Sequence, residues 1–545
     1  FLEISGATRF VIETARRVFA RVTGGPALVS VVSSGLLGSL SGSAVANSML
    51  SGNFTIPMMR QGGFNRETAA GIEAAASTGG ALVPPVMGAG AYMILDMIDP
   101  TVTFLQIMKA AVIPACLYYF SVLVIVYLYA LRVGARPVET QETEPQESRT
   151  LDGVIFVTSL VLLVFLLLRG LTPFRAVTGS LVAIMLMSVF RDKIGDGVRL
   201  TSRSRIFMLV AFVVGVAIYF GWSLLFTDTF DEPLPRSKWF DVGLEASIVG
   251  MLAMIIAGLF ERNWQPTILD AMRKSARNGV SLIAAAACVG IIIGIVLQTG
   301  IADDFSSRIK DVVEQNLLLA LIGIMICSIV LGMGVPSVVC YLLVATLMAT
   351  LLGDMGVIPL GAHLFIFYFG MMSMVTPPVA LAAYATSSIA ESNMMKTAFT
   401  AFRFALVGFT LPYMFIYRPA LLLMDGGAWQ AWMDAETNSP EKAELLSAAN
   451  AAWPAWTEIA IAVGAAVAGI LALAAGIAGY LRGRLPTPWR VVLFVAAAML
   501  LLPEIYVAGR DVGVWVNLAG AALFALVVFV SPGTNTPEVA SVDSM

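Results

Sequence analysis

The chain has 545 residues, of which 58% are hydrophobic and only 13% are charged, and its formal net charge is −3. Soluble domains carry about 45–50% apolar and about 25% charged residues, so this composition, with a mean hydropathy of +0.85, excludes a soluble globular domain. The charge offers no basic face, and we expect no nucleic-acid partner. Continuous apolar runs such as 111–130 and 491–502, in place of the alternation of a membrane barrel, predict helices that cross a bilayer. We therefore expect an all-α, polytopic helical membrane protein.

The predicted elements begin with residues 5–21, whose apolar and charged side chains are typical of an amphipathic helix on a membrane surface. A second surface helix is predicted at 302–315, and a polar linker at 136–150. Runs of apolar residues predict full crossings near 103–131, 153–169, 174–190, 206–226, 242–260, 279–299, 398–417, 456–480, 489–503 and 512–530. Four further apolar stretches are interrupted by Gly, Ser, Thr or Pro, at 27–59, 67–96, 316–352 and 362–390.

The loop charges predict the orientation of the chain in the membrane. Lys and Arg gather in 191–205, 261–277 and 481–490, which places these segments in the cytoplasm. The acidic and aromatic loops 227–241 and 418–455 suit the outside. The sides alternate across every span if the first and third interrupted stretches are hairpins that enter and leave on one side.

The interrupted stretches form a repeat. A shift of 293 positions carries Pro84-Pro85 onto Pro377-Pro378 and Gly63 onto Gly356. Each copy contains a hairpin, a glycine turn and a helix broken before Pro-Pro, and the loop charges give the copies opposite orientations. Inverted repeats with broken helices are typical of secondary transporters. We expect a first inverted repeat at 1–131, linker and scaffold helices at 132–260, a second inverted repeat at 261–424 and accessory transmembrane helices at 425–545.

The breaks are the candidate site. Irregular backbone survives in lipid only where it lines a polar cavity, so the freed carbonyls and nearby hydroxyls can bind a hard cation. The half-helix after each break points a positive N-terminal end at the cavity, which suits an anion. We expect two quasi-equivalent cation sites flanking one substrate site, and the side chains predicted to bind substrate are Ser43, Asn47, Ser77, Thr78, Ser337 and Thr376. The alternative is that these small residues serve close helix packing.

Two other sets of side chains deserve interpretation. Glu73 lies one helical turn before Ser77, either as an interfacial carboxylate paired with Arg66 or Arg60, or as a coupling or proton-relay group. The four cysteines lie in apolar runs without paired spacing, which indicates buried free thiols.

The residues around both hairpins resemble those of a known transporter family. The stretches GSLSGSAVANSMLSGNFTIPMMRQGGF, EAAASTGGALVPPVMGAGAYM, LGMGVPSVVCYLLVATLM and HLFIFYFGMMSMVTPPVALAAYA are similar to the fused membrane subunit of tripartite ATP-independent periplasmic (TRAP) transporters of the TAXI type. The similarity covers roughly residues 1–424, with both hairpins and both Pro-Pro helices in the family's order.

This resemblance implies an elevator-type carrier in the bacterial inner membrane. It would import an organic acid by sodium symport from a TAXI-type periplasmic binding protein, with small-subunit helices fused ahead of Phe1. Its sodium ligands would be Ser41, Ser43, Asn47, Ser77 and Thr78 in one copy, and Gly332, Gly334, Ser337, Ser373 and Thr376 in the other.

Three alternatives remain. The same fold could be proton-coupled, with Glu73 as the coupling group, or independent of a binding protein. An intramembrane enzyme would need a general base or metal ligands that one histidine and scattered acids hardly supply. A channel would need a continuous lined pore instead of paired hairpin tips.

Overall fold

A computed structural model describes most of the chain. The described residues are 7–137, 150–190, 193–194, 198–199, 201–226, 236–262, 264–300, 316–435, 441–501, 506–507, 510–511 and 513–530. They are overwhelmingly helical, and the strands form two antiparallel pairs, β1 (Lys193–Ile194) with β2 (Val198–Arg199) and β3 (Tyr506–Val507) with β4 (Arg510–Asp511). The predicted all-α architecture is confirmed. The predicted surface helix at 302–315 and most of the linker at 136–150 lie outside the described residues.

Seven helices in the described part of the chain are long and apolar enough to cross a membrane. They are Phe104–Val133, Ser202–Leu225, Lys238–Phe260, Ser337–Asp354, Met394–Tyr417, Trp456–Ala478 and Gly513–Val530. The crossings predicted at 174–190 and 489–503 correspond to shorter apolar helices of 17 and 15 residues. Those predicted at 153–169 and 279–299 fall in helices of 19 and 35 residues, Thr150–Leu168 and Gln265–Thr299. The chain is a polytopic helical membrane protein, as expected, although fewer helices reach full length than the sequence indicated.

One compact unit contains residues 1–13 and 142–285. Its helices are α7 (Thr150–Leu168), α8 (Pro173–Val189), α9 (Ser202–Phe226) and α10 (Arg236–Phe260), with the start of α1 (Ala7–Phe19). Met185, Met208, Met254 and Trp264 are at the centre of its core. The helix α11 (Gln265–Thr299) is continuous, so the basic segment 261–277 is largely helical and not only a loop.

The predicted amphipathic helix is confirmed as α1. Val11 and Ala15 are buried, whereas Arg9 and Arg17 are exposed. Its position on a membrane surface stays a prediction.

The second unit, residues 14–141 and 286–545, contains both repeats. The first is α2 (Gly25–Ser41), α3 (Ala44–Gln61), α4 (Arg66–Thr78), the 3-10 helix η1 (Gly79–Leu82), α5 (Gly88–Met97) and α6 (Phe104–Val133). The second is α13 (Leu317–Leu331), α14 (Ser337–Asp354), α15 (Pro359–Met372), η3 (Ser373–Val375), α16 (Leu381–Ala390), α17 (Met394–Ala405), η4 (Leu406–Thr410) and α18 (Leu411–Tyr417). The shift of 293 carries both ends of α3 onto α14 and both ends of α5 onto α16, so the repeat in the sequence is a repeat of structure.

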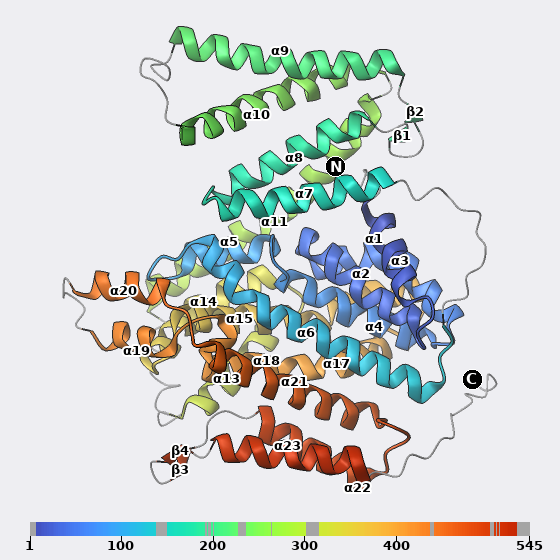
Figure 1. Ribbon diagram of the computed structural model, residues 1–545, viewed down its shortest axis with the longest axis vertical. Coiled ribbons are helices and arrows are strands. Elements are labelled where there is room, and N and C mark those ends of the chain that lie inside the picture. The colour runs from blue at the N-terminus through green and yellow to red at the C-terminus, as the bar shows by residue number, and fades with distance from the viewer. Residues whose placement is uncertain are drawn as a thin grey trace. The chain divides into compact units, whose positions relative to one another are not determined.

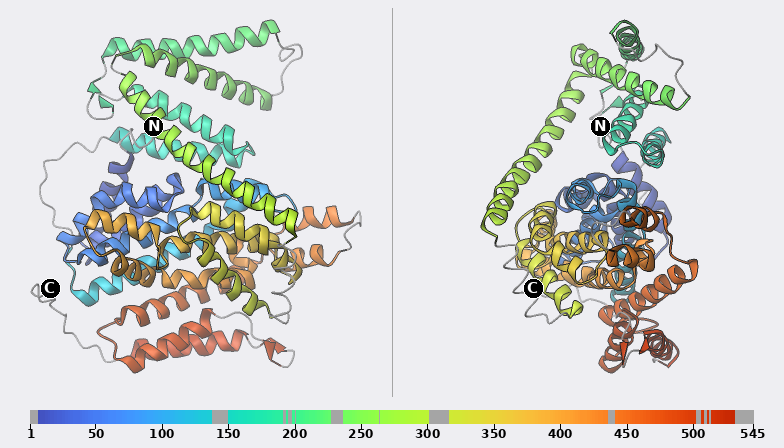
Figure 2. Two further views of the ribbon diagram at one scale, coloured as in Figure 1. Left: turned by 180° about the vertical axis from the view of Figure 1, so that it is seen from behind. Right: turned by 90° about the vertical axis from the view of Figure 1, so that its left-hand side faces the viewer.

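The two repeats interleave within this unit. The half-helix α16 of the second repeat packs on α3 and α4 of the first, while α5 of the first packs on α14 and α15 of the second. The packing is close, because a Cβ atom at Gly90 would lie 2.2 Å from the Phe367 ring. The blue and cyan helices of the first repeat and the yellow and orange helices of the second therefore lie among one another in Figure 1 and in both views of Figure 2.

One predicted crossing, 398–417, is interrupted. The 3-10 helix η4 separates α17 from α18. Pro412 has no N–H to offer the carbonyl four residues earlier, that of Gly408. This carbonyl accepts instead from the Leu411 N–H, in a 3-10 turn, and from the Tyr368 hydroxyl at 2.9 Å. A proline and a distant tyrosine thus account for an interruption that hydrophobicity alone did not indicate.

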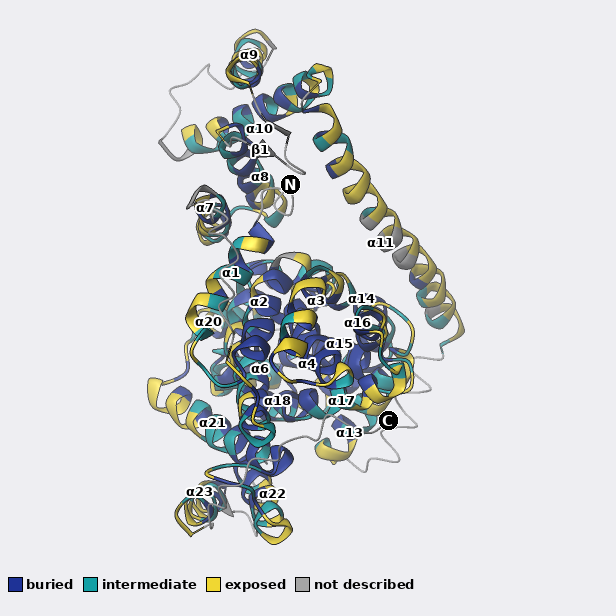
Figure 3. Ribbon diagram, turned by 90° about the vertical axis from the view of Figure 1, so that its right-hand side faces the viewer, coloured by how far each residue is buried: buried dark blue, intermediate teal, exposed yellow. Residues whose placement is uncertain are grey.

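The remaining elements follow the second repeat. They are η5 (Pro419–Leu422), α19 (Gly426–Asp434), α20 (Glu441–Ala451), α21 (Trp456–Ala478), α22 (Thr487–Leu501) and α23 (Gly513–Val530). The helix α21 packs along α6, and Arg132 and Arg403 donate to the carbonyls of Ala478 and Ile477 at its end. Buried residues gather around α2, α4 and α15, which form the centre of this unit (Figure 3).

Candidate functional site

The first hairpin tip is a short non-helical turn between α2 and α3. Gly42 ends α2 with φ of 62°, in the left-handed region, and the Ser43 hydroxyl caps α3 by accepting from the Ala46 N–H at 3.3 Å. A Cβ atom at Gly42 would lie 2.1 Å from the Cα atom of Gly88. The tip therefore touches the backbone at the start of α5, and Gly42 is required both by its dihedral angle and by this contact.

The broken helix beside this tip is stabilised by two tyrosines. When α4 gives way to the 3-10 helix η1, its last carbonyls lose their α-helical donors. The hydroxyls of Tyr118 and Tyr119 on α6 donate to the carbonyls of Ala75 and Ala76, at 2.7 and 2.8 Å. These bonds satisfy freed backbone groups in an apolar environment, as a membrane interior requires.

Asn47 is the polar side chain that joins the hairpin to the broken helix. It is fully buried, and its Nδ2 atom donates to the carbonyl of Ser34 at 2.8 Å and to that of Ser77 at 3.4 Å. Its Oδ1 atom has no hydrogen-bond partner among the described residues. Since a buried acceptor is normally satisfied, this oxygen is available to a ligand such as a cation.

The predicted residues of the first copy therefore divide into two groups. Asn47, Ser77 and Thr78 are fully buried, and the first two are in contact. Ser41 and Ser43 are exposed at the tip of the hairpin. The Thr78 hydroxyl donates within its own helix, to the carbonyl of Ala74 at 2.8 Å.

Glu73 lies in α4, about one helical turn before the break, and is completely buried. It accepts five hydrogen bonds from hydroxyls: Ser34 (2.7 Å), Ser51 (2.5 Å) and Ser77 (2.9 Å) on Oε1, and Ser30 (2.6 Å) and Thr55 (2.5 Å) on Oε2. The interpretation of Glu73 as an interfacial partner of Arg66 or Arg60 is wrong, because Glu73 is fully buried and its carboxyl oxygens accept from hydroxyls, while Arg66 pairs with Glu391 at 3.6 Å. The carboxyl group of Glu73 can be buried because five hydroxyl groups donate hydrogen bonds to it.

Of these hydroxyl residues, the sequence predicted a site role for Ser77 but not for Ser30, Ser34, Ser51 or Thr55. A signal was present: Ser30 and Ser34 are four residues apart in an apolar helix, as are Ser51 and Thr55, so each pair lies on one helix face.

The second copy has a similar backbone with different side chains. After α13, Gly332 ends the helix, Gly334 has φ of 82°, and α14 begins at Ser337. The Ser373 hydroxyl lies 3.2 Å from the carbonyl of Gly332 and donates to that of Gly370 at 2.7 Å, so the second hairpin also contacts its broken helix. The Thr376 hydroxyl donates to Met372 at 2.8 Å, within its own turn.

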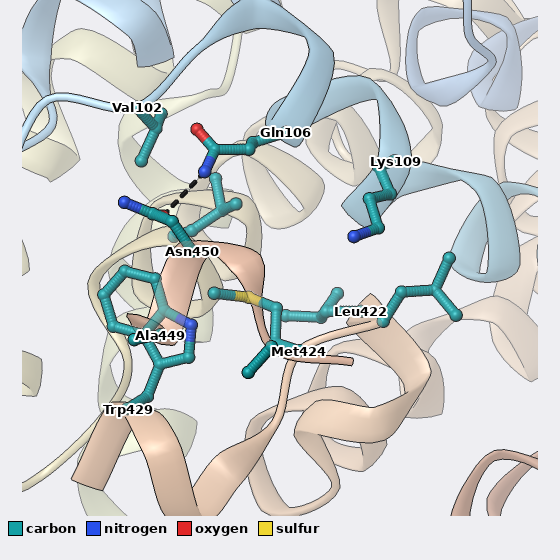
Figure 4. Close-up of a pocket in the computed structure, with 11 residues that line it drawn as sticks. Val102, Gln106, Lys109, Leu422, Met424, Trp429, Ala449 and Asn450 are labelled. Atoms are coloured by element: carbon teal, nitrogen blue, oxygen red, sulfur yellow. Dashed lines mark hydrogen bonds between the residues drawn. The ribbon is translucent and has the colours of Figure 1, made fainter. Parts of the chain in front are cut away.

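Two pockets lie away from the breaks. One, shown in Figure 4, lies beside the Gln106–Asn450 hydrogen bond of 2.6 Å and has a volume of about 20 Å³, enough for a single water. The other, of about 890 Å³, lies between the α3–α4 turn and the α16–α17 turn and includes Arg60 and Arg66. Neither pocket is lined by a residue of the hairpin tips or of the helix breaks.

Comparison with known proteins gives the family. Residues 1–232 and 241–429 match the family described as the tripartite ATP-independent periplasmic transporter, DctM component. The chain belongs to this family. The hairpins, the broken helices and the Pro-Pro segments all lie within the matched residues. Membership of the DctM family confirms the predicted TRAP permease at the level of the family and makes the chain a membrane component of a transport system.

Individual relatives are distant. The C4-dicarboxylate TRAP transporter large permease protein DctM of Vibrio cholerae is 22% identical over 444 residues, 78% of this chain and 83% of that protein. The protein of the same name from Pseudomonas aeruginosa is 24% identical over 273 residues, 48% of this chain and 61% of its own length. The uncharacterized protein y4mL of Sinorhizobium fredii is 28% identical over 257 residues, 46% of this chain and 59% of its own length. The chain thus spans less than two thirds of the length of two of these relatives.

Proposed function

We propose that this chain is the permease of a TRAP-TAXI system in the bacterial inner membrane, which imports an organic acid by sodium symport and an elevator-type movement. The periplasmic binding protein delivers the acid, and small-subunit helices complete the membrane part. Two relatives are described as C4-dicarboxylate transporters, which supports a small dicarboxylate as the first substrate to test. The TAXI assignment rests on the resemblance of the hairpin and Pro-Pro segments.

The observation that carries the sodium proposal is the unpartnered Oδ1 atom of Asn47. The Asn47 side chain bridges the first hairpin and the first broken helix, because it donates to the carbonyls of Ser34 and Ser77. Ser77 and the adjacent Thr78 offer further backbone and hydroxyl oxygens at this break. Oxygen ligands of this kind suit a hard cation. The neighbouring half-helix α5 points its N-terminal end toward the same tip, through the Gly42–Gly88 contact, and would attract a carboxylate.

The test is uptake of radiolabelled succinate into proteoliposomes that contain the complete permease. A sodium gradient, a proton gradient and a TAXI-type binding protein are varied separately, and unlabelled mono- and dicarboxylates compete for uptake. We expect uptake only with both sodium and the binding protein. If uptake instead follows the proton gradient in the absence of sodium, the coupling ion is the proton and the sodium proposal is wrong.

That proton-coupled carrier is the second candidate, and the buried carboxyl group of Glu73 favours it. Uptake without a binding protein would instead overturn the tripartite assignment. Competition by monocarboxylates alone would change the substrate class while leaving the mechanism in place.

A further inference from the structure

The polar cluster around Glu73 occurs in only one of the two repeats. The shift of 293 that superimposes the repeats carries Glu73 onto Ile366. It carries the five hydroxyl residues Ser30, Ser34, Ser51, Thr55 and Ser77 onto Gly323, Cys327, Val344, Met348 and Gly370. A whole hydrogen-bonded cluster is therefore replaced by apolar or small residues, although α3 and α14 coincide at both ends. We name the six polar residues of the first repeat the Glu73 cluster.

The Glu73 cluster ties three helices together. Two of its hydroxyls come from α2, two from α3 and one from α4, which also contains Glu73, and all six side chains are fully buried. Among the residues that the structure describes, the carboxyl group forms no ion pair. Hydrogen bonds to a carboxyl group buried in a low-dielectric interior are strong, and losing one is costly.

Three members of the cluster also contact Asn47. The carbonyls of Ser34 and Ser77 accept from the Asn47 Nδ2 atom, while their hydroxyls donate to Glu73. The Ser51 hydroxyl lies 2.5 Å from Glu73 Oε1 and 2.7 Å from the carbonyl of Asn47. Any displacement of Glu73 is thereby transmitted to the side chain that carries the unpartnered oxygen.

We propose that Glu73 is a positioning residue that locks the first hairpin onto the first broken helix, so that the first repeat holds its break more rigidly than the second. The inference rests on the proposed function insofar as it predicts an effect on cation affinity. In the second repeat the hairpin is bonded to its broken helix at the tip, between Ser373 and Gly332, and near the start of α15, where the Tyr341 hydroxyl and His363 Nδ1 lie 2.8 Å apart. At the positions of the cluster itself, apolar or small residues replace the polar ones. The two hairpins consequently differ in rigidity, and the first cation site is the preformed one.

A loosened hairpin has a defined kinetic consequence. When the binding-competent geometry is populated only for a fraction of the time, the apparent affinity for the cation falls by that fraction. Saturating cation restores the competent state, so the maximal uptake rate per permease molecule changes little. A role in folding alone would lower the amount of permease in the membrane and leave the half-saturating concentration unchanged.

The transport test uses Thr55, which contacts Glu73 Oε2 and the Ser51 carbonyl of its own helix, and which follows Asn47 in α3 by about two helical turns. We expect Thr55→Val to raise the half-saturating sodium concentration of uptake about fivefold, the factor for one lost hydrogen bond, and Thr55→Ser to restore it. Glu73→Gln should raise it about tenfold or more. Ser33→Ala is the matched control, because the Ser33 hydroxyl is equally buried in α2 and donates within its own helix to Val29 at 2.6 Å. Unchanged half-saturation in Thr55→Val and Glu73→Gln would overturn the proposal.

A second measurement needs no transport. Hydrogen–deuterium exchange of the purified permease should accelerate at 36–47 and 77–83 in Glu73→Gln and Thr55→Val, while the second hairpin at 329–338 stays unchanged. Equal acceleration in both hairpins, or none, would refute the lock. Wild-type uptake without sodium dependence would refute the sodium proposal alone, because the exchange result still tests Glu73.

Discussion

Asn47 shows how one buried amide can serve two purposes. Its Nδ2 atom satisfies carbonyls of two different helices, which fixes the orientation of the side chain and leaves the oxygen as the free end. A serine or a hydrophobic residue at this position could not bridge both carbonyls and still offer an acceptor.

Asn47→Ala tests this residue. It should raise the half-saturating sodium concentration of uptake about tenfold and lower the free energy of unfolding by about 2 kcal/mol, because the carbonyls of Ser34 and Ser77 lose their donor. Uptake titrations and thermal unfolding in detergent measure the two effects. Asn53→Ala is the control, since Asn53 is exposed on the same helix and donates to Met49 of its own turn. Equal behaviour of the two variants would remove Asn47 from the site.

The glycines of the two hairpin tips are required for different reasons. Gly42 combines φ of 62° with a contact to the Gly88 backbone. Gly334 has φ of 82°, but a Cβ atom there would lie 3.9 Å from its nearest neighbour, a side-chain carbon of Val379. Gly42→Val and Gly334→Val should both abolish uptake while the protein still inserts, because β-branched residues rarely adopt these dihedral angles.

The smaller substitutions separate the two causes. Gly334→Ala introduces only backbone strain, about 1–2 kcal/mol, and should retain measurable uptake. Gly42→Ala adds a clash with Gly88 and should retain none. Uptake rates, normalised to the permease that reaches the membrane, give the comparison, and equal activity of the two alanine variants would contradict it.

At the scale of elements, two of the helix interruptions, at η1 and η4, receive hydrogen bonds from tyrosine hydroxyls of another helix. Tyr118 and Tyr119 of α6 donate to carbonyls at the end of α4. Tyr368 of α15 donates to the Gly408 carbonyl, which Pro412 cannot reach with an N–H and which also accepts from the Leu411 N–H. Tyr118 also fills the space beside Gly79 and Gly408, where a Cβ atom would lie 2.1 and 2.7 Å from its ring. One aromatic residue therefore packs against interruptions in both repeats.

Tyr118→Phe should lower the free energy of unfolding by about 1–3 kcal/mol, because the Ala75 carbonyl remains buried without its donor. Tyr127→Phe on the same helix is the control, since Tyr127 is 38% exposed. Thermal unfolding of the two variants in detergent measures the difference. No difference between them would mean that another group satisfies the carbonyl.

At the scale of the whole molecule, the two repeats share one core, because the half-helices α5 and α16 each pack on helices of the other repeat. The half-helix after each Pro-Pro segment packs on the other repeat, so neither hairpin has a complete environment alone. The chain needs both copies to bury its broken segments, which explains why a repeat with so little identity keeps coincident helix ends.

The topology of the repeats can be tested by labelling. Single cysteines at Arg60 and Asp354, both exposed, should react with an impermeant thiol reagent from opposite sides of the membrane, because the positive loops between the copies force an odd number of crossings. The background must lack the native cysteines: Cys340 is buried as predicted, but Cys116 and Cys288 are exposed on their helices. Labelling of both positions from the same side would make the repeats parallel and exclude the elevator proposal.

Sequence alone determined the features that depend on local chemistry. The apolar composition required a lipid-facing helical protein, Gly42 and Gly334 marked the tips, and the two Pro-Pro segments marked the breaks, because glycine and proline act on the backbone where they stand. The 293-residue shift followed from the same positions. The DctM family match then agreed with the resemblance of these segments to TRAP permeases.

The tertiary structure alone decided which distant groups meet. Glu73 and Ser30 are 43 positions apart, and nothing in their local sequence indicates whether a carboxyl group faces an arginine at the surface or a set of hydroxyls in the interior. The interruption at η4 and the exchange of half-helices likewise depend on contacts between different helices. Local pattern fixes where a helix bends or ends, whereas the partner of a buried polar group is fixed by the packing of helices that lie far apart in the chain.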